Sequence, residues 1–467
     1  MNKLNIIYMH THDSGRYWSP YGYAVPTKHI QEFAKESTVF RQCYCAGPTC
    51  SPSRSALLTG YNPHSNGMQG LASRGWQLND YDKHLVRFLQ KQNYLTTLCG
   101  IQHVAPASHM IGYDRILGSQ DFSMDSTESS MEDWDYLNTE AACGFLSSYQ
   151  DDKPFFLSMG WFNTHREFPK ASKTFNPDYI QVPFPLYDCD TNRRDMADYH
   201  ESVQVVDNCF GMIMDTLKKK NLLQNTIIIL TTDHGIAFPK MKCTLFDSGI
   251  GVAFLFAYPG NPMKGRATDA LVSQMDIFPT LCDLLDIEKP EWLEGYSLVP
   301  LLEGSTQNIR DEIFSEVTYH AAYEPKRCIR TDRYKLIRLF DNHSNIVPAN
   351  IDEALSKSFL MEHGYGTKCR EKELLFDLWL DASESDNLIG NPAYASIYED
   401  LFQRLETWML KTHDPLLQVG SRVPKPKGAR VNTFSCQNPR LEEYEEEGLS
   451  GARYQTDSKP GLDCDVS

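Results

Sequence analysis

Four short apolar runs each lead into histidine or aspartate, and this arrangement constrains the fold more than any other feature of the chain. Continuous apolar runs of this length are typical of strands buried on both faces, as in a mostly parallel sheet. The runs are Asn5–Met9, Tyr94–Gly100, Phe155–Trp161 and Thr226–Leu230. Because open α/β sheets bind ligands beyond the carboxyl ends of their strands, we expect the polar residues after these runs to converge on one site.

The polar residues that follow the four runs are candidates for that site. They are His12, Asp13, His103, His165, Asp233 and His234. An ordinary place in a surface loop would explain any one of them, but it does not explain why all four runs end in this way.

Helical patterns separate the runs, and the clearest one spans Met196–Lys219 with apolar positions on one face. Strands that alternate with helices indicate an α/β sandwich. After about Arg310 the apolar residues alternate instead, which predicts an antiparallel sheet with one solvent-exposed face, followed by a helix over Ile397–Leu410. The alternating segments are Phe314–Thr318, Arg327–Arg330, Tyr334–Leu339 and Glu373–Leu378.

The predicted fold class is therefore α/β, with a large mostly parallel central sheet and a smaller C-terminal α+β subdomain that contains a short antiparallel sheet. A chain of 467 residues is long enough for two such units. We predict a catalytic α/β domain over 1–309, the antiparallel subdomain over 310–423 and an irregular tail over 424–467. The tail carries the acidic run Glu442–Glu447, and we expect it either to pack loosely on the surface or to cover a pocket.

Composition narrows the cellular setting. An apolar content of 41% is that of a globular protein, and no apolar stretch approaches the length of a membrane span. Met1–Ile7 runs directly into the first predicted strand and leaves no room for a signal peptide, so we expect a cytoplasmic protein whose 13 cysteines are mostly reduced. Cys43 and Cys45 lie near Cys50, but no second pair follows at zinc-ribbon spacing.

The run Cys50-Ser51-Pro52-Ser53-Arg54, continued by Leu57-Leu58-Thr59-Gly60, indicates specific chemistry. Pro52 suits the first turn of a helix, whose free N–H groups and positive dipole would face an anion held over Cys50. Arg54 adds a permanent positive charge. This run resembles the signature of type I sulfatases, in which the cysteine is oxidised to Cα-formylglycine (3-oxoalanine). A buried structural cysteine before a helix is the alternative.

The resemblance extends over nearly the whole chain and is most similar to the sulfamidase branch, the N-sulfoglucosamine sulfohydrolases. Other segments with family-like motifs are Asp233–Pro239, Lys242–Gly249, Asp276–Leu281, Glu316–Thr318 and Thr412–Pro415. It implies an alkaline-phosphatase-like sandwich for the large domain and one divalent metal ion held by family positions. Those positions are His12, Asp13, Cys50, Asp233 and His234 in this sequence.

Two positions depart from the family pattern. His12 stands where the family has an acid, and it either binds the metal or faces another ligand or the substrate. The family metal is Ca²⁺, but imidazole donors also suit Zn²⁺ or Mn²⁺. The segment Gly100-Ile101-Gln102-His103 lacks the sulfate-binding lysine of the family, so either Gln102 or a residue from elsewhere replaces it, or the bound group carries less charge.

The resemblance also implies roles for the catalytic residues. The hydrated formylglycine at Cys50 would attack sulfur, while Lys242 and Arg54 neutralise the developing charge. His165 would protonate the leaving alcohol or amine, and His103 would act as the base that helps release sulfate. A formylglycine-generating enzyme or an anaerobic sulfatase-maturating enzyme is then a required partner, and assembly into a homo-oligomer is left open.

The net charge of −16 argues against nucleic acid and anionic membrane as partners and favours a small sulfated substrate, expected to be a sugar, over a polyanionic polymer. The predicted activity is formylglycine-dependent hydrolysis of a sulfate ester or sulfamate. Two alternatives stay open from the sequence: a phosphodiesterase or phosphonate monoester hydrolase of the same superfamily, and a catalytically silent protein that binds anions.

Overall fold

An eight-stranded central sheet forms the large part of the molecule in the computed structural model, which describes residues 4–119, 130–417 and 422–437. Its strand order is β5-β4-β6-β1-β7-β8-β2-β9, and within it only β8 runs against its neighbours. The strands are β1 (Asn5–Thr11), β2 (Thr38–Phe40), β4 (Leu95–Gly100), β5 (Arg115–Leu117), β6 (Phe155–Gly160), β7 (Thr226–Thr232), β8 (Phe254–Ala257) and β9 (Arg266–Thr268). The predicted mostly parallel sheet is confirmed.

The four predicted strands lie side by side, as β4, β6, β1 and β7, and their carboxyl ends are level. His10 pairs with Gly160 of β6, and Thr11 pairs with Thr232 of β7. Gly100 at the end of β4 pairs with the same Gly160. The polar residues after these strands therefore leave the sheet at one level.

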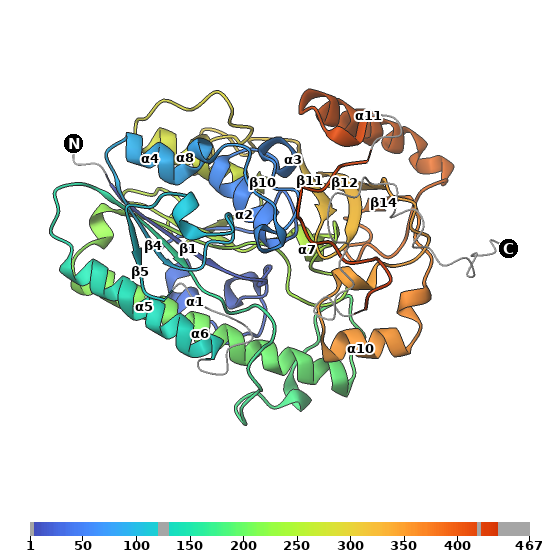
Figure 1. Cartoon of the computed structure of the whole chain (residues 1–467), viewed down its shortest axis with the longest axis horizontal. Coiled ribbons are helices and arrows are strands. Elements are labelled where there is room, and N and C mark those ends of the chain that lie inside the picture. Colours follow the sequence, from blue (N-terminus) through green and yellow to red (C-terminus); the bar gives the residue numbers. More distant parts are fainter. Residues whose placement is uncertain (1–3, 120–129, 418–421, 438–467) are drawn as a thin grey trace.

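Helices cover both faces of this sheet (Figure 1). One face packs on α1 (Lys28–Ala34), α5 (Met131–Ser148) and α6 (Asp190–Lys219), and the other packs on α2 (Cys50–Thr59), α4 (Leu85–Lys91) and α8 (Ile277–Leu284). Alternate residues of β1 enter the two cores: Ile7 and Met9 face α5 and α6, whereas Ile6 and Tyr8 face α2 and α4. This alternation follows from the two-residue repeat of a strand.

Helix α6 begins at Asp190, six residues before the predicted start at Met196. The first six residues of the helix are polar or charged, so they carry no apolar repeat. Asp195 is buried there because it makes a bidentate ion pair with Arg166, at 2.7 and 2.9 Å.

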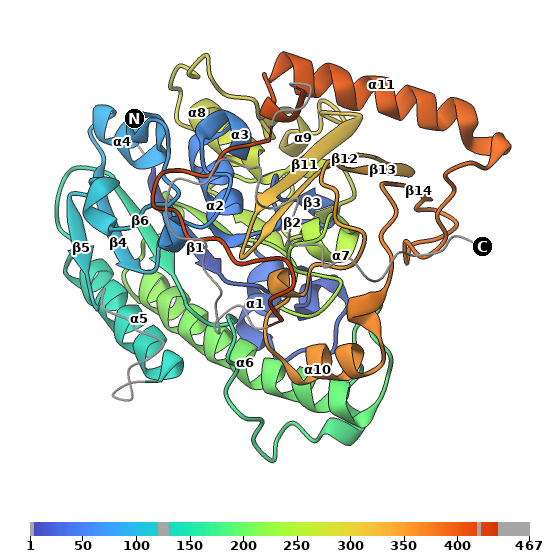
Figure 2. The same cartoon turned by 45° about the vertical axis from the view of Figure 1, so that its right-hand side comes forward.

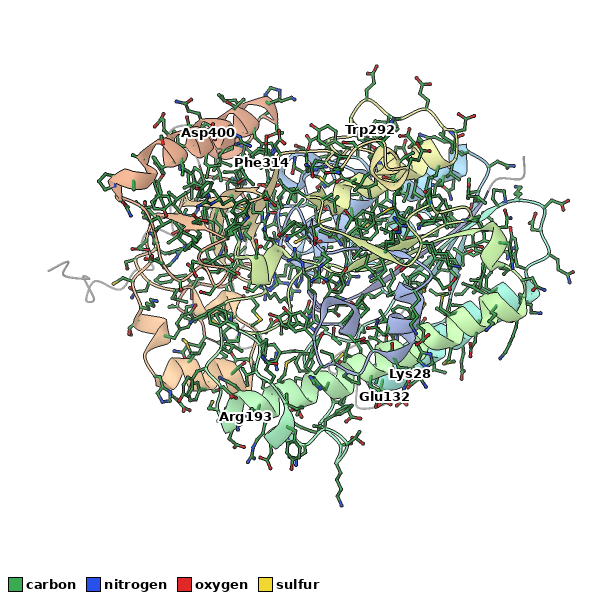
Figure 3. All side chains as sticks on the ribbon, turned by 180° about the vertical axis from the view of Figure 1, so that it is seen from behind. Lys28, Glu132, Arg193, Trp292, Phe314 and Asp400 are labelled. Carbon is green, nitrogen blue, oxygen red and sulfur yellow. The ribbon has the colours of Figure 1, made fainter. Side chains whose placement is uncertain are left out.

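The antiparallel C-terminal sheet is also confirmed, with the order β11-β12-β13-β14 (Figure 2). Its strands are β11 (Glu312–Tyr319), β12 (Tyr323–Thr331), β13 (Tyr334–Leu339) and β14 (Glu373–Asp377). Helix α11 (Ala395–Lys411) covers one face of this sheet, and Figure 3 shows Phe314 of β11 beside this helix, which carries Asp400. The ring of Phe314 stacks on Trp408 of α11 at a centroid distance of 4.8 Å.

The expectation of one solvent-exposed face on this sheet is wrong. Ile329 and Leu336 pack against α11, while Cys328 and Ile337 belong to the core shared with the central sheet. Neighbouring charged residues, among them Arg327 and Lys335, are also buried, in ion pairs. In the sequence alone, charged residues buried in ion pairs cannot be told from charged residues on a solvent-exposed face.

A buried ionic cluster joins this sheet to α3 (Pro63–Asn66), the short helix after α2. Glu316 accepts hydrogen bonds from the backbone N–H of His64 at 2.8 Å and from its Nδ1 at 3.0 Å. Arg327 binds Glu316 at 3.0 Å and Asp414 at 2.5 and 3.1 Å. Burial alone would lower the pKa of His64, but Glu316 and Asp414 outweigh it and raise that pKa. We refer to His64, Glu316, Arg327 and Asp414 as the ionic knot.

The described part of the tail, 424–437, is not loosely packed, which corrects that expectation. Val431 and Asn432 are fully buried, and the side chain of Arg74 donates a hydrogen bond to Asn432 Oδ1 at 2.8 Å. Glu442–Glu447 lies outside the described residues, and the domain bounds 1–309, 310–423 and 424–467 remain predictions.

Three further short helices are α7 (Asp247–Ile250), α9 (Val299–Leu302) and α10 (Leu355–Glu362). None of the helices among the described residues combines the length and the apolar character needed to cross a bilayer. Cys369 is disulfide-bonded, and the remaining cysteines within the described ranges are free thiols.

Candidate active site

Cys50 is the first residue of α2, and the local sequence explains why the helix begins there. Thr49 before it is extended, and Pro52 lies in the first turn, where its missing N–H costs no hydrogen bond. Gly60 ends the helix in the left-handed conformation that glycine adopts readily. The whole helix is buried, so the thiol of Cys50 is held at its N-terminal end against the carboxyl edge of the central sheet.

The Cys50 thiol lies next to residues from both β1 and β7. Its Sγ is 3.4 Å from Nε2 of His234 and 3.9 Å from Oδ1 of Asp13. Burial, the largest influence, raises the pKa of this thiol well above the usual value even though Lys242 opposes it. Nδ1 of His234 lies 3.0 Å from the carbonyl oxygen of Gly235, and any side chain at Gly235 would meet the carbonyl oxygen of Ser248.

A cluster of four donor groups surrounds this point. One ligand atom from each of His12, Asp13, Cys50 and Asp233 lies within 4.8 Å of the others, and all four residues are buried. Nδ1 of His12 is 3.4 Å from Oδ2 of Asp233, and Nε2 of His234 is 3.3 Å from Oδ1 of Asp13. The structure therefore brings together all five residues that the sequence assigned to the metal.

The donors in this cluster suit a divalent cation. Neither ring nitrogen of His12 has a hydrogen-bond partner within the described part of the chain, although the residue is fully buried. Burial, reinforced by Arg54 and His103, lowers the pKa of His12 well below its usual value, so the ring is in the neutral form that binds metals. Two carboxylates with imidazole nitrogen match a site for Mn²⁺ or Zn²⁺ as well as Ca²⁺.

The backbone of Asp13 has an uncommon conformation and is hydrogen-bonded to Asp233. Its φ is +35°, and its N–H donates to Oδ1 of Asp233 at 2.9 Å. His103, at the end of β4, also has a positive φ, of +54°. Such conformations are uncommon for residues other than glycine and are concentrated at functional sites.

The side chains of Arg54 and Lys242 both lie at the donor cluster, and each is paired with one of its carboxylates. Nε and Nη2 of Arg54 donate to Oδ2 of Asp233 at 3.0 and 2.9 Å. The ammonium of Lys242 lies 2.8 Å from Oδ2 of Asp13 and 2.8 Å from Oδ2 of Asp352. Burial opposes the charge of Lys242, but Asp13 and Asp352 outweigh it and raise the pKa of the lysine.

His103 and His165 flank His12 on opposite loops. Their ring centroids lie 4.8 and 5.1 Å from the ring of His12, each in an edge-on arrangement. Burial lowers the pKa of both residues, with Arg54 adding to the effect at His103 and Lys242 at His165. Nδ1 of His165 lies 2.5 Å from the carbonyl oxygen of Arg166, so this nitrogen carries the proton and Nε2 is the nitrogen available to a ligand.

Gln102 does not replace the missing lysine. Its Oε1 accepts hydrogen bonds from the N–H groups of Val104 and Ala105 at 2.5 and 2.8 Å, and its Nε2 donates to the carbonyl of Ala105 at 2.7 Å. The amide therefore holds its own loop together, which rules out the first of the two replacements considered from the sequence.

Sequence reasoning missed two residues that lie near the site. Asp352 comes from the segment between β13 and β14, and His320 comes from the end of β11. Lys242 and His234 both act electrostatically on His320, whose pKa is lowered mainly by burial. Neither residue follows a predicted strand of the central sheet, so no pattern in the sequence indicates it.

Comparison with known protein families shows which family the chain belongs to. The model of the Sulfatase family matches residues 5–287, more than half of the chain. The chain belongs to the sulfatase family. Its enzyme class is that of a sulfuric ester or sulfamate hydrolase. A second model, the C-terminal region of N-sulphoglucosamine sulphohydrolase, matches residues 235–348, in agreement with the resemblance to the sulfamidase branch.

Two curated relatives illustrate the family. Human N-sulphoglucosamine sulphohydrolase is 26% identical over 447 residues, which cover 84% of this chain and 87% of that protein. An ulvan-active sulfatase of Formosa agariphila is 28% identical over 454 residues, with 94% of this chain and 86% of that protein covered.

Solved structures confirm the fold. A protein solved in complex with its substrate D-glucosamine-2-N,6-O-disulfate superposes with a TM-score of 0.69 at 20% identity, over 89% of this chain and all of that one. A structure described as a 2-O glycosaminoglycan sulfatase has a TM-score of 0.68 at 20% identity, over 94% of this chain and 99% of that one. At this identity the likeness concerns the fold alone.

Proposed function

We propose that this sulfatase depends on formylglycine at Cys50 and hydrolyses a sulfate ester or sulfamate on a small sugar, with release of inorganic sulfate. The observation that carries the proposal is the position of Cys50 at the start of α2, with its Sγ 3.4 Å from His234 and within the donor cluster of His12, Asp13 and Asp233. The relatives that act on sulfated sugars support the substrate class.

The metal would be held by His12, Asp13 and Asp233 together with the group at position 50, and His234 lies close enough to Asp13 to join them. A bound divalent cation supplies Lewis-acid polarisation of the sulfate oxygens and favours an ionised nucleophile. Arg54 fixes the carboxylate of Asp233 with two hydrogen bonds, and Lys242 fixes that of Asp13 with one, so the donors are oriented before any ligand arrives.

The residue at position 50 is the proposed nucleophile. Oxidised to formylglycine, it would supply one hydroxyl of the hydrated aldehyde to attack sulfur and the other to expel sulfate. The N-terminus of α2 directs its free N–H groups and its partial positive charge to the same point, which favours a bound anion. Lys242 and Arg54 contribute permanent positive charge where negative charge develops.

His165 is the proposed general acid. Because its Nδ1 proton is held by the carbonyl of Arg166, its Nε2 is the atom that would receive and then donate the proton. Its lowered pKa keeps the ring neutral without a ligand, and the negative charge of a bound sulfate would favour protonation. His103, on the other side of His12, is the proposed base for the release of sulfate.

Further parts of the proposal concern the surroundings of the enzyme. Oxidation of Cys50 to formylglycine requires a partner, either a formylglycine-generating enzyme or an anaerobic sulfatase-maturating enzyme. The net charge of −16 favours a fragment with few negative groups over an intact sulfated polymer. A cytoplasmic location, the absence of nucleic acid and membrane partners, and the oligomeric state remain predictions from the sequence.

The test is sulfate release from a panel of N- and O-sulfated mono- and disaccharides, assayed with the protein co-expressed with a maturation enzyme. Intact sulfated polymers and phosphate diesters belong in the same panel. We expect sulfated mono- or disaccharides to be turned over fastest. Faster cleavage of the polymer would contradict the size argument, and faster cleavage of the diester would move the protein to the phosphodiesterase and phosphonate hydrolase class. No turnover of any compound would favour a silent anion-binding protein.

A further inference from the structure

Asp352 reaches the active site from the C-terminal part of the chain and is held there by its own segment. The turn before it is anchored to the segment that enters β12, because the N–H of Ala322 donates to Oδ1 of Asn350 at 2.8 Å. Nζ of Lys357, five residues after Asp352, donates to the carbonyl of Ile351 at 2.8 Å. The two residues that precede Asp352 are therefore both anchored.

Asp352 is the outer end of a chain of ion pairs that starts at the metal cluster. Asp13 binds Lys242, and Lys242 binds Asp352, each at 2.8 Å. The exposed fraction of the side chains rises along this chain, from 0% for Asp13 to 4% for Lys242 and 16% for Asp352. Asp352 is therefore the most exposed of the three, and a substrate that approached from this side would meet it before Lys242.

The carboxylate of Asp352 is ionised in this setting. Burial alone would raise its pKa, but Lys242, His165 and His320 outweigh burial and lower it. His165, the proposed acid for the leaving group, is one of the residues that act electrostatically on Asp352, so the two residues belong to the same part of the site.

This negative charge is unexpected in a pocket that binds an anion. Asp13 and Asp233 are paired with Lys242 and Arg54, and Asp352 adds a third carboxylate next to these two cations. The segment Gly100-Ile101-Gln102-His103 lacks the lysine of the family as well. A bound divalent cation would add positive charge at the inner donors, whereas the carboxylate of Asp352 at the outer end repels a second anionic group placed next to it.

We propose that Asp352 determines substrate specificity. Its carboxylate admits sugars in which the substituents next to the scissile sulfate are hydroxyl, amine or amide groups without negative charge. It disfavours sugars that carry a second sulfate or a carboxylate at those positions. The inference rests on the proposed sulfatase function and specifies the substrate of the same site. A carboxylate also accepts hydrogen bonds from sugar hydroxyls, which gives uncharged neighbours a direct partner.

The experiment compares matched substrate pairs with the full-length, matured protein. One pair is N-sulfoglucosamine and its 3-O-sulfated analogue, and the other is N-acetylglucosamine 6-sulfate and its 4,6-disulfate. The kcat/KM of each member is measured for the wild type, for Asp352→Asn and for Asp352→Ser, with thermal unfolding as the check on folding. Glu353→Gln is the control, because this neighbouring carboxylate pairs with Lys357 rather than with Lys242.

We expect the wild type to cleave at least one of the two substrate pairs. Within that pair, the kcat/KM of the singly charged member should exceed that of the doubly charged member by about tenfold or more, the effect expected for two like charges a few ångströms apart. Asp352→Asn should reduce this ratio by about tenfold, chiefly through a lower KM for the doubly charged member, and Glu353→Gln should leave it unchanged. An equal loss for both members in both Asp352 variants would show that the residue only holds Lys242, and would overturn the inference alone. Failure of the wild type to release sulfate from any member would overturn the proposed function together with it.

Discussion

Nε2 of His234 lies 3.4 Å from Sγ of Cys50, although one residue ends a strand of the central sheet and the other begins a helix 184 positions earlier in the chain. The contact places the proposed nucleophile within reach of the residues after β1 and β7. It is the relationship on which the proposed chemistry depends; the first prediction tests Cys50, and the second tests the donor residues around it.

Cys50→Ala should abolish sulfate release without unfolding the protein. The side chain is small and lies at a helix start whose backbone conformation alanine adopts, so we expect a cost in stability of about 1 kcal/mol. Mass spectrometry of the peptide that contains Cys50, taken from the native host, should show formylglycine in the wild type. A native peptide that carries only the thiol, in a protein with full activity, would disprove the dependence on oxidation.

Asp233→Asn should lose the bound metal and destabilise the fold. The substitution leaves Arg54 buried without its ion-pair partner, and breaking a buried pair in this way costs about 3–5 kcal/mol. Metal analysis of the purified variant checks the first effect, and denaturant unfolding checks the second. His12→Ala separates two roles: loss of metal assigns His12 to the metal, whereas full metal content with lost activity assigns it to the substrate.

Arg327→Met should destabilise the protein by about 3–5 kcal/mol, because Glu316 and Asp414 of the ionic knot lose their shared partner while buried. Arg193→Met is the matched control, since Arg193 pairs with Asp188 on the outside of the molecule (Figure 3). We expect no change in the midpoint of chemical unfolding for this control. Equal midpoints for the two variants would contradict the structural importance of the knot.

The fourth prediction concerns acid stability. Burial, aided by Arg87, lowers the pKa of His84 to about 3, and its Nδ1 accepts a hydrogen bond from the N–H of Val86 at the start of α4. The unfolded chain binds this proton near pH 6.5 and the folded chain does not. The contribution of His84 to stability is therefore complete above about pH 6.5 and is lost as the pH falls toward 3, by up to about 1.4 kcal/mol per pH unit.

His84→Asn tests this linkage, because asparagine can accept the same backbone hydrogen bond without titrating. The free energy of unfolding of wild type and variant should be measured between pH 7 and the acid limit of the folded state. The wild type should lose stability more steeply below about pH 6.5. Parallel curves for the two proteins would show that His84 is not held neutral by the fold.

The sequence predicts the residues of the site that directly follow strands, because parallel strands in one sheet bring their carboxyl ends together whatever the loops do. For this reason the strand pattern alone predicts that His12, Asp13, His103, His165 and Asp233 lie at one edge of the sheet. Cys50 was found through a different signal, the composition of a helix start.

The remaining features could not be predicted because they depend on contacts between distant segments. Asp352 lies in an irregular segment, and its role follows only from the 2.8 Å contact with Lys242. The alternation around β12 predicts an exposed face because Arg327 is charged, but Arg327 is buried with partners from other segments of the chain, Glu316 and Asp414. The polar first turns of α6 were missed for the same reason, since Asp195 is buried by its pairing with Arg166.

The ionic knot has a consequence for how the molecule can be divided. Its two acids and Arg327 come from the C-terminal part, whereas His64 follows directly after the helix that begins with Cys50. Exchanging the C-terminal sheet alone would take Glu316 and Arg327 from one relative and leave His64 and Asp414 from the other. A functional chimera within this family therefore needs His64 and its helix to be transplanted with the sheet, and the boundary between exchangeable modules runs through the catalytic half of the chain.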